Sequence, residues 1–148
     1  MRGNSQLMRS ANSLGRKCRS MKTPLMLLLT SDCQLEDLVA DALSQVGGVS
    51  HLTCDAGDAL ETICDVQDLD AAIIDFEHGP HGMTLLGAIN TVREDLPVIV
   101  ITRDDQKHVE ALAYANGATI CFAKPVLRSE LTRAICGLCK SKLEQAVA

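Results

Sequence analysis

Aromatic side chains are almost missing from this chain of 148 residues, which has one tyrosine, two phenylalanines and no tryptophan. A core must therefore be built from Leu, Ile, Val and Ala, and the hydrophobic share of 47% is large enough for one. Surfaces that bind nucleic acids commonly stack bases on aromatic rings. The composition therefore argues against nucleic-acid binding by the folded part of the chain.

Long apolar runs are also absent. No stretch approaches the roughly 18 apolar residues of a membrane-spanning helix, and no apolar segment resembles a secretion signal. The cysteines are odd in number and fall mostly within predicted strands and helices, so we interpret them as reduced, small apolar residues. We expect a cytoplasmic protein without a membrane partner. The seven cysteines are at positions 18, 33, 54, 64, 121, 136 and 139.

Acidic residues are absent from positions 1–23, which hold six basic ones. The rest of the chain keeps 8 of the 14 basic residues and all 19 acidic ones, so its net charge is 8 minus 19, or −11. We expect residues 1–23 to be a disordered basic arm, or to precede the true start, and residues 24–148 to form one domain. The arm could contact RNA, a membrane surface or an acidic partner, whereas the acidic body suits a cation.

Short, continuous apolar runs alternate with segments whose apolar residues recur at helical spacing. Five such strand–helix pairs are typical of a parallel sheet covered on both faces. We predict an α/β fold with a doubly wound, five-stranded parallel sheet of order 2-1-3-4-5, in a flavodoxin-like three-layer sandwich. The predicted strands are 25–29, 49–54, 69–75, 98–101 and 119–122, and the predicted helices are about 33–46, 55–67, 83–93, 105–115 and 129–144.

Polar residues stand at the ends of three predicted strands. Asp75 ends the third, Thr102 follows the fourth and Lys124 follows the fifth. Ligands of open parallel sheets bind just beyond the carboxyl ends of the strands. Taken alone, Asp75 could simply cap a turn and Lys124 could be a solvated lysine. Three such residues at three strand ends favour a common site.

With these residues in this order, positions 25 to about 140 resemble the receiver domain of bacterial two-component response regulators. In that family, the aspartate of the third strand accepts a phosphoryl group, and a hydroxyl and a lysine hold the phosphoryl oxygens. The resemblance gives these roles to Asp75, Thr102 and Lys124. The lysine lies in the run Phe122-Ala123-Lys124-Pro125, and the resemblance implies a cis peptide between Lys124 and Pro125.

The family's acidic pair, which follows the first strand and binds magnesium, is degenerate here. Aligning the first helix puts the pair on Thr30 and Ser31, with Asp32 next, while a shift by one would put Asp32 in the second acid position. The resemblance implies a metal site of Asp32, Asp75 and the backbone carbonyl of Glu77. Because Mg²⁺ prefers charged oxygen ligands, we expect weak or absent Mg²⁺ binding and slow or absent phosphorylation.

Two further positions depart from the family pattern. Arg103 stands where a small residue is usual, and its side chain could crowd the phosphoryl site or partly replace the cation. Cys121 replaces the aromatic switch residue, although Phe122 is next to it. The loop after Asp75 is also about one residue short, with Gly79 where proline is usual.

We therefore predict a stand-alone receiver domain of a two-component or phosphorelay pathway, and not an enzyme. The phosphoryl donor would be a histidine kinase or a phosphotransfer protein. A downstream protein would bind the face of the fourth helix, the fifth strand and the fifth helix. The sequence does not decide whether the chain forms a homodimer. The alternative is a pseudo-receiver that binds a partner without any phosphoryl chemistry.

Three other patterns give weaker hypotheses. Cys136 and Cys139 form a CxxC pair, but it lies inside a predicted helix and lacks further ligands at zinc spacing, so packing is favoured over redox sensing or metal binding. His78 and His81, beside Glu77, could bind a transition metal, although loop histidines are usually solvated. A flavin site would need a phosphate-binding loop and aromatic rings, which the chain lacks.

Overall fold

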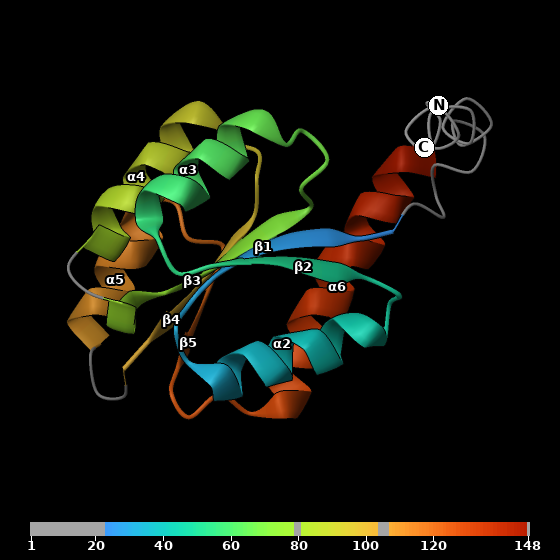
Figure 1. The fold of residues 1–148 in the computed structure, drawn as a ribbon, viewed down its shortest axis with the longest axis horizontal. Helices are drawn as coiled ribbons and strands as arrows, with labels where there is room; N and C mark the ends of the chain where they lie inside the picture. Colours follow the sequence, from blue (N-terminus) through green and yellow to red (C-terminus); the bar gives the residue numbers. More distant parts are fainter. Residues whose placement is uncertain (1–22, 79–80, 104–106, 148) are drawn as a thin grey trace.

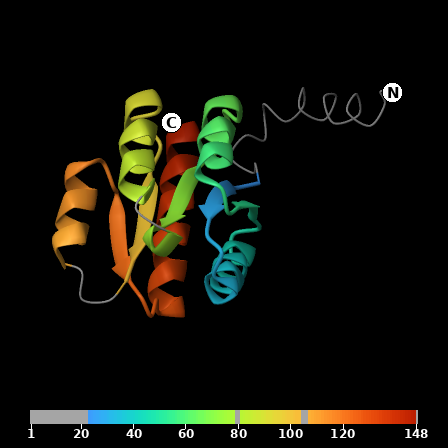
Figure 2. The same cartoon turned by 60° about the vertical axis from the view of Figure 1, so that its left-hand side comes forward.

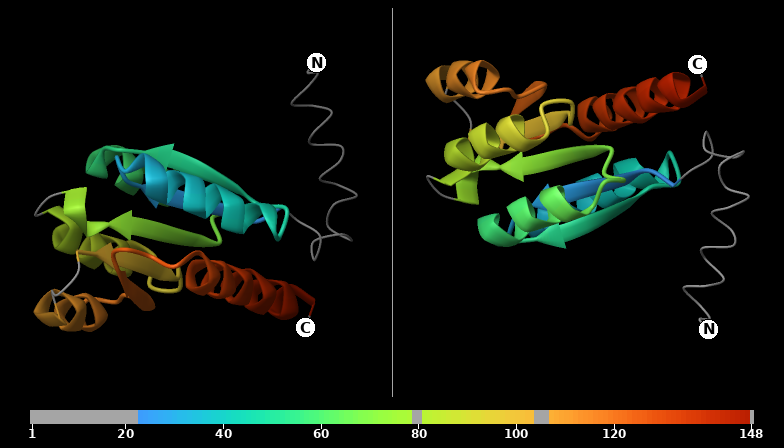
Figure 3. Two further views of the ribbon diagram at one scale, coloured as in Figure 1. Left: turned by 90° about the horizontal axis from the view of Figure 1, so that it is seen from below. Right: turned by 90° about the horizontal axis from the view of Figure 1, so that it is seen from above.

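The computed structural model describes residues 23–78, 81–103 and 107–147. Within them, five parallel strands form one sheet in the order β2-β1-β3-β4-β5. Figure 3 shows this order from β2 (teal) on one side of the sheet to β4 and β5 (yellow and orange) on the other. The predicted doubly wound α/β fold is confirmed. The predicted basic arm lies, apart from Thr23, outside the described residues.

Strands and helices alternate along the whole domain, as the apolar pattern predicts. The strands are β1 (Leu25–Leu29), β2 (Val49–Thr53), β3 (Ala71–Asp75), β4 (Val98–Thr102) and β5 (Ile120–Ala123). The helices are α2 (Cys33–Ser44), α3 (Ala56–Asp65), α4 (His81–Val92), α5 (Lys107–Ala115) and α6 (Arg128–Val147), and a short 3-10 helix, η2 (Phe76–His78), follows β3.

Both faces of the sheet are covered by helices, and each face has its own apolar cluster. Alternate strand residues point to opposite sides. Leu27 and Ile74 belong to the cluster under α3, α4 and α5, whereas Leu28 and Ile73 belong to the cluster under α2 and α6. Figures 1 and 2 show α3 and α4 side by side on one face, and Figure 1 shows α2 and α6 on the other. Every residue of β3 and β4 is therefore buried.

The parallel register brings the carboxyl ends of the central strands to one edge. Asp75 of β3 pairs with Ile101 of β4, and Thr102 pairs with Ala123 of β5. The residue after β1, Thr30, donates its amide to the Thr53 carbonyl at the end of β2. The side chains that follow these strands therefore start from neighbouring backbone positions.

Some predicted boundaries are wrong by one or two residues. The last helix begins at Arg128, so Ser129 lies inside it, and the first helical bond runs from the Leu131 amide to the Leu127 carbonyl. Helix α4 begins at His81 and includes Gly82, which was expected in the turn. Only glycine fits there, because a Cβ on Gly82 would lie 2.7 Å from the Phe76 ring.

Two expectations about side-chain burial are also wrong. Leu112 of α5 was expected to face inward, but its side chain is 52% exposed, while the adjacent Ala113 is buried. Cys33, Cys54 and Cys64 are exposed rather than packed in the core. No disulfide joins the six cysteines of the described ranges. Among the helices described, none combines the length and the apolar character needed to span a membrane.

Candidate functional site

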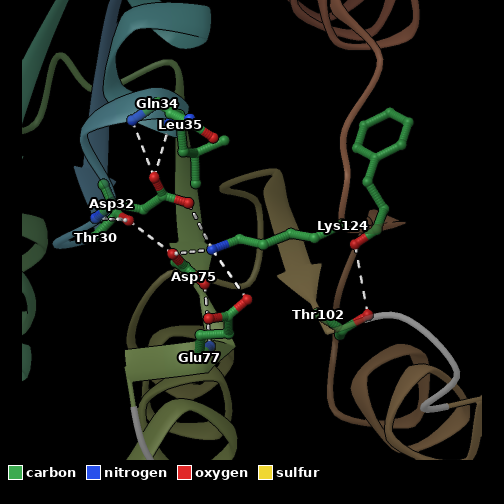
Figure 4. A network of polar contacts seen from close by, with 9 residues as sticks. Thr30, Asp32, Gln34, Leu35, Asp75, Glu77, Thr102 and Lys124 are labelled. Carbon is green, nitrogen blue, oxygen red and sulfur yellow. Dashed lines mark hydrogen bonds and ion pairs between the residues drawn. The ribbon is translucent and has the colours of Figure 1, made fainter.

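Asp75 is the most buried carboxylate at the carboxyl edge of the sheet, with 2% of its surface exposed. Its Oδ2 accepts a hydrogen bond from the Thr30 hydroxyl at 2.7 Å and one from Lys124 Nζ at 3.0 Å. Its Oδ1 accepts the backbone N–H of Glu77 at 3.0 Å. A buried carboxylate needs such partners, because an unpaired charge in a nearly dry site is strongly unfavourable. Both oxygens of Asp75 are therefore held in fixed directions (Figure 4).

Lys124 brings three carboxylates together at one point. Its Nζ lies 2.9 Å from Asp32 Oδ2, 3.0 Å from Asp75 Oδ2 and 3.2 Å from Glu77 Oε2. Desolvation of the partly buried ammonium would lower its pKa, but the hydrogen bonds that it donates to the carboxylates of Asp32, Asp75 and Glu77 outweigh this effect and raise the pKa of Lys124 above its ordinary value. The ammonium is therefore a permanent cation of the site. The Lys124–Pro125 peptide is cis, in agreement with the expectation from the resemblance.

Asp32 has two functions in this arrangement. Its Oδ1 accepts the backbone N–H groups of Gln34 and Leu35, which caps the first turn of α2. Its Oδ2 faces Lys124. The hydrogen bond from Lys124 lowers the pKa of Asp32 below the ordinary value, although burial acts in the opposite direction. Helix capping and the ion pair together fix the orientation of this carboxylate.

Thr102 lies at the same edge of the sheet, but its hydroxyl does not face Asp75. The Oγ1 donates to the Phe122 carbonyl of β5 over 3.5 Å, at the long limit of a hydrogen bond, and the side chain is buried. The Thr102 carbonyl accepts the amide of Lys124. Figure 4 shows Thr102 beside β5 and apart from the carboxylates around Lys124. The structure thus joins the side chains of Asp75 and Lys124 directly, while Thr102 is connected to them through the backbone, by its carbonyl to Lys124 and by the pairing of β4 with β3.

The residues fit a magnesium ion poorly. Asp32, Asp75 and Glu77 supply the charged oxygens that Mg²⁺ prefers, but all three carboxylates point at the Lys124 ammonium. The Thr30 hydroxyl, at the first position of the degenerate pair, is used as a donor to Asp75. No group of three or more His, Cys, Asp and Glu side chains in the described ranges has a geometry suited to a metal ion.

Several other candidates stay apart from this arrangement. Arg103 is exposed, and Cys121 is half-buried on β5, where its amide donates to the Tyr114 hydroxyl. Burial raises the pKa of the Cys121 thiol to about 11. Cys139 is buried, and burial together with the nearby Asp70 and Cys136 raises its pKa to about 11. The side chains of His78 and His81 lie outside the described residues.

The side chain of Glu77 is the functional group that sequence reasoning missed. The resemblance gives only the Glu77 backbone a role, yet its carboxylate pairs with Lys124. No periodic pattern signals it, because Glu77 lies in η2, where the alternation of side chains in an extended strand has ended. A cavity of about 360 Å³ opens next to this group, between α2 and the loop after β5. It is lined by Asp32, Gln34, Leu35, Leu38, Lys124, Pro125 and Val126.

Comparison with known proteins gives a family match over most of the chain. The model of the response regulator receiver domain family matches residues 28–136. No curated protein matches the chain. A CheY-like receiver domain protein from Methanospirillum hungatei is 21% identical, with a TM-score of 0.70 over 84% of this chain and 97% of that chain.

Two other solved structures show how this fold is used elsewhere. NtrX from Brucella abortus is 25% identical with a TM-score of 0.71, and the match covers 85% of this chain but 28% of NtrX. HP1043, an orphan response regulator of H. pylori, is 19% identical with a TM-score of 0.68, over 78% of this chain and 96% of that one. The fold therefore occurs both within a longer protein and in chains of about this length.

Proposed function

Because this chain belongs to the family of response regulator receiver domains, we propose that it is a cytoplasmic receiver whose Asp75 accepts a phosphoryl group slowly. The observation that carries the proposal is the 3.0 Å ion pair between Asp75 and Lys124 at the carboxyl edge of the sheet. Phosphoryl transfer depends on positioning and on neutralising charge, and this pair supplies both. The domain then acts as a signalling module rather than as an enzyme.

In the proposed step, a carboxylate oxygen of Asp75 attacks the phosphorus of the donor. A bond from this oxygen to phosphorus forms, and the bond from phosphorus to the donor breaks. The donor leaves with the electron pair, as acetate from acetyl phosphate or as an imidazole from a phosphohistidine. Lys124 would neutralise part of the charge on the new phosphoryl group. Thr102 would turn its hydroxyl from the Phe122 carbonyl to a phosphoryl oxygen.

Magnesium, when bound to a receiver, neutralises charge on the phosphoryl oxygens. Here the carboxylates that would hold it already face Lys124, and Thr30 offers a neutral hydroxyl. We therefore expect weak Mg²⁺ binding and slow phosphorylation. Isothermal titration of the unmodified protein with Mg²⁺ at neutral pH tests this point, and ordinary tight binding would contradict it.

The proposed donor is a histidine kinase or a phosphotransfer protein. Leu35, Leu38 and Val126 line the cavity beside Lys124, and they offer an apolar surface next to the reactive carboxylate. The proposed downstream protein binds the face of α5, β5 and α6, where the Leu112 and Tyr114 side chains are about half exposed. A rotation of the Thr102 side chain would first change the hydrogen bonding of β5, because the hydroxyl now donates to the Phe122 carbonyl.

The test is the intact mass of the protein after incubation with acetyl phosphate and Mg²⁺. We expect a gain of about 80 Da on the wild type, the mass of one phosphoryl group. The control is Asp75→Asn, which keeps the shape of the side chain and removes the nucleophilic oxygen charge. An equal mass gain in the wild type and in Asp75→Asn would overturn the assignment of Asp75.

A second function, partner binding without phosphoryl chemistry, is favoured by the ion pairs of Lys124 and by the missing acidic pair. All three carboxylates around Lys124 are paired with it, and neutral Thr30 and Ser31 occupy the positions of the acidic pair. Such a site could serve only to fix the fold of a pseudo-receiver that binds a partner without phosphoryl chemistry. A wild type that gains no mass from acetyl phosphate, and whose thermal stability does not change with the donor, would favour this function over the first.

A further inference from the structure

The Lys124 ammonium is already surrounded by carboxylates: it donates hydrogen bonds to Asp32 and Asp75 and forms an ion pair with Glu77. An ammonium group donates three hydrogen bonds. Three carboxylate oxygens, from Asp32, Asp75 and Glu77, lie 2.9, 3.0 and 3.2 Å from Lys124 Nζ. A phosphoryl group that approaches Asp75 must therefore share this ammonium with Asp32 and Glu77, or displace one of them, even though Asp75 Oδ2 gives up its own contact when it bonds to phosphorus.

The three carboxylates differ in how firmly they are held. Asp75 is buried, and both of its oxygens have further donors in Thr30 and the Glu77 amide. Asp32 is held at its other oxygen by the N–H groups that it caps in α2. The Glu77 side chain is the most exposed of the three, at 42%, and its contact with Lys124 is the longest. Glu77 is therefore the partner that leaves Lys124 most easily.

The net charge of the site is a second reason to single out Glu77. Asp32, Asp75 and Glu77 contribute three negative charges and Lys124 one positive charge, so the group carries a net charge of −2. A phosphoryl donor also arrives with about −1.5 to −2 charges at neutral pH. The exposed Glu77 carboxylate stands at the open side of this group and repels the donor before any transfer takes place.

We propose that the Glu77 side chain is an internal competitor of the phosphoryl group, which occupies its place on Lys124 and slows phosphorylation of Asp75. This inference rests on the proposed function, and it concerns the carboxylate of Glu77 rather than the backbone carbonyl. Glu77 acts through Lys124 and through its charge, so it is a positioning residue. Phosphorylation is then slower while Glu77 stays on Lys124 and faster when its side chain turns away into solvent.

The experiment compares Glu77→Gln with the wild type in the full chain. Glu77→Gln keeps the size of the side chain and removes its charge. The matched control is Glu94→Gln, which removes one exposed carboxylate from the loop between α4 and β4, at the opposite edge of the sheet. The quantity measured is the second-order rate constant for phosphorylation by acetyl phosphate, from intact mass over time, at low and at high salt.

We expect Glu77→Gln to raise this rate constant about twofold to fivefold at about 0.05 M salt, the scale of one partly exposed ion pair. The ratio should fall towards one at about 1 M salt, where charges are screened within roughly 3 Å. A purely structural role of Glu77 would not give a gain that depends on salt. Glu94→Gln should match the wild type at both salt concentrations.

The outcomes separate this inference from the proposed function. A phosphorylated wild type with an unchanged or slower Glu77→Gln variant overturns the role of Glu77 and leaves Asp75 as the acceptor. A gain that is equal at low and high salt, or that Glu94→Gln also shows, overturns it too. If neither the wild type nor Glu77→Gln gains a phosphoryl group, the proposed function fails, and the inference fails with it.

Discussion

At the scale of single residues, one ammonium group organises the site. Lys124 contacts carboxylates from three parts of the chain: Asp32 lies in the loop after β1, Asp75 ends β3 and Glu77 lies in η2. The sequence predicted that Asp75 and Lys124 would meet, because both follow strands of one parallel sheet. It did not predict the side-chain contact of Glu77 or the bond from Thr30 to Asp75. Those depend on side-chain rotamers, which strand periodicity does not determine.

The charge of Asp32 should stabilise the fold only above acidic pH. Asp32→Asn keeps an oxygen that can cap α2 and removes the charge that faces Lys124. Because Lys124 lowers the folded-state pKa of Asp32, the charge contributes fully above the unfolded value of about 3.9 and is lost as the pH falls through the lower folded value. We expect the variant to be less stable by a few tenths to about 1 kcal/mol at neutral pH.

Urea unfolding of the wild type and Asp32→Asn at neutral pH and at about pH 2 measures this difference. The two proteins should be equally stable at the acidic end, where both side chains are uncharged. A stability difference of the same size at both pH values would show that capping geometry, and not charge, is responsible.

The cysteines should differ strongly in reactivity. Cys33 and Cys64 are exposed, whereas Cys139 is buried with a pKa raised to about 11. Because the thiolate is the reactive form, we expect Cys139 to react with iodoacetamide at pH 8 at least about tenfold more slowly than Cys33 and Cys64. Peptide mass mapping at several times checks this order. Equally fast labelling of Cys139, or a disulfide to Cys136, would revive the redox hypothesis.

At the scale of elements, an arginine that directly follows one helix caps the end of the neighbouring helix. The Arg93 guanidinium, just after α4, donates to the carbonyls of Ile63, Val66 and Gln67 at the C-terminal end of α3. Those carbonyls have no partner within the helix, and they carry the negative end of the helix dipole. Arg93 therefore joins two helices that are packed on the same face of the sheet.

Arg93→Met should lower the free energy of unfolding by about 1.5–3 kcal/mol, since it removes hydrogen bonds from a charged donor to partly buried acceptors. The matched control is Arg128→Met. Arg128 pairs with Asp41 at 2.7 Å, but its side chain is 67% exposed, so we expect a loss below about 1 kcal/mol. Urea unfolding of both variants measures the two losses. A larger loss for Arg128→Met would contradict the capping role of Arg93.

The element boundaries show what sequence patterns can and cannot determine. The strands are predicted to within two residues, because short apolar runs in a two-sided sheet have few alternatives. Ser129 was mistaken for a cap because serine is a common one, while Leu127 makes the first helical bond instead. Leu112 was placed inward because its spacing fits a helix, but α5 is short and buries Ala113. Local chemistry does not determine how a helix is rotated against the sheet.

At the scale of the whole molecule, two apolar clusters share one sheet. Ile73 and Ile74 are adjacent in β3, fully buried, and belong to opposite clusters. Because the same strands bear both clusters, neither cluster can unfold while the other stays intact. We expect Ile73→Ala and Ile74→Ala each to destabilise the protein by about 2–5 kcal/mol.

Both variants should still unfold in one transition. Circular dichroism, which follows the helices, and the reaction of buried thiols, which follows the core, should give the same midpoint. Separate midpoints in either variant would show that the two faces of the sheet unfold independently.

The central claim concerns one carboxylate among several at the same edge of the sheet. Asp32, Asp75 and Glu77 all lie within 3.2 Å of Lys124 Nζ. The decisive observation is therefore which of these three carboxylates carries the phosphoryl group. The most direct measurement is borohydride reduction of the protein after treatment with acetyl phosphate, followed by peptide mass mapping, because borohydride converts an aspartyl phosphate to homoserine. The account predicts homoserine at position 75 alone. An unmodified peptide at that position, or modification at position 32 or 77 instead, would contradict it.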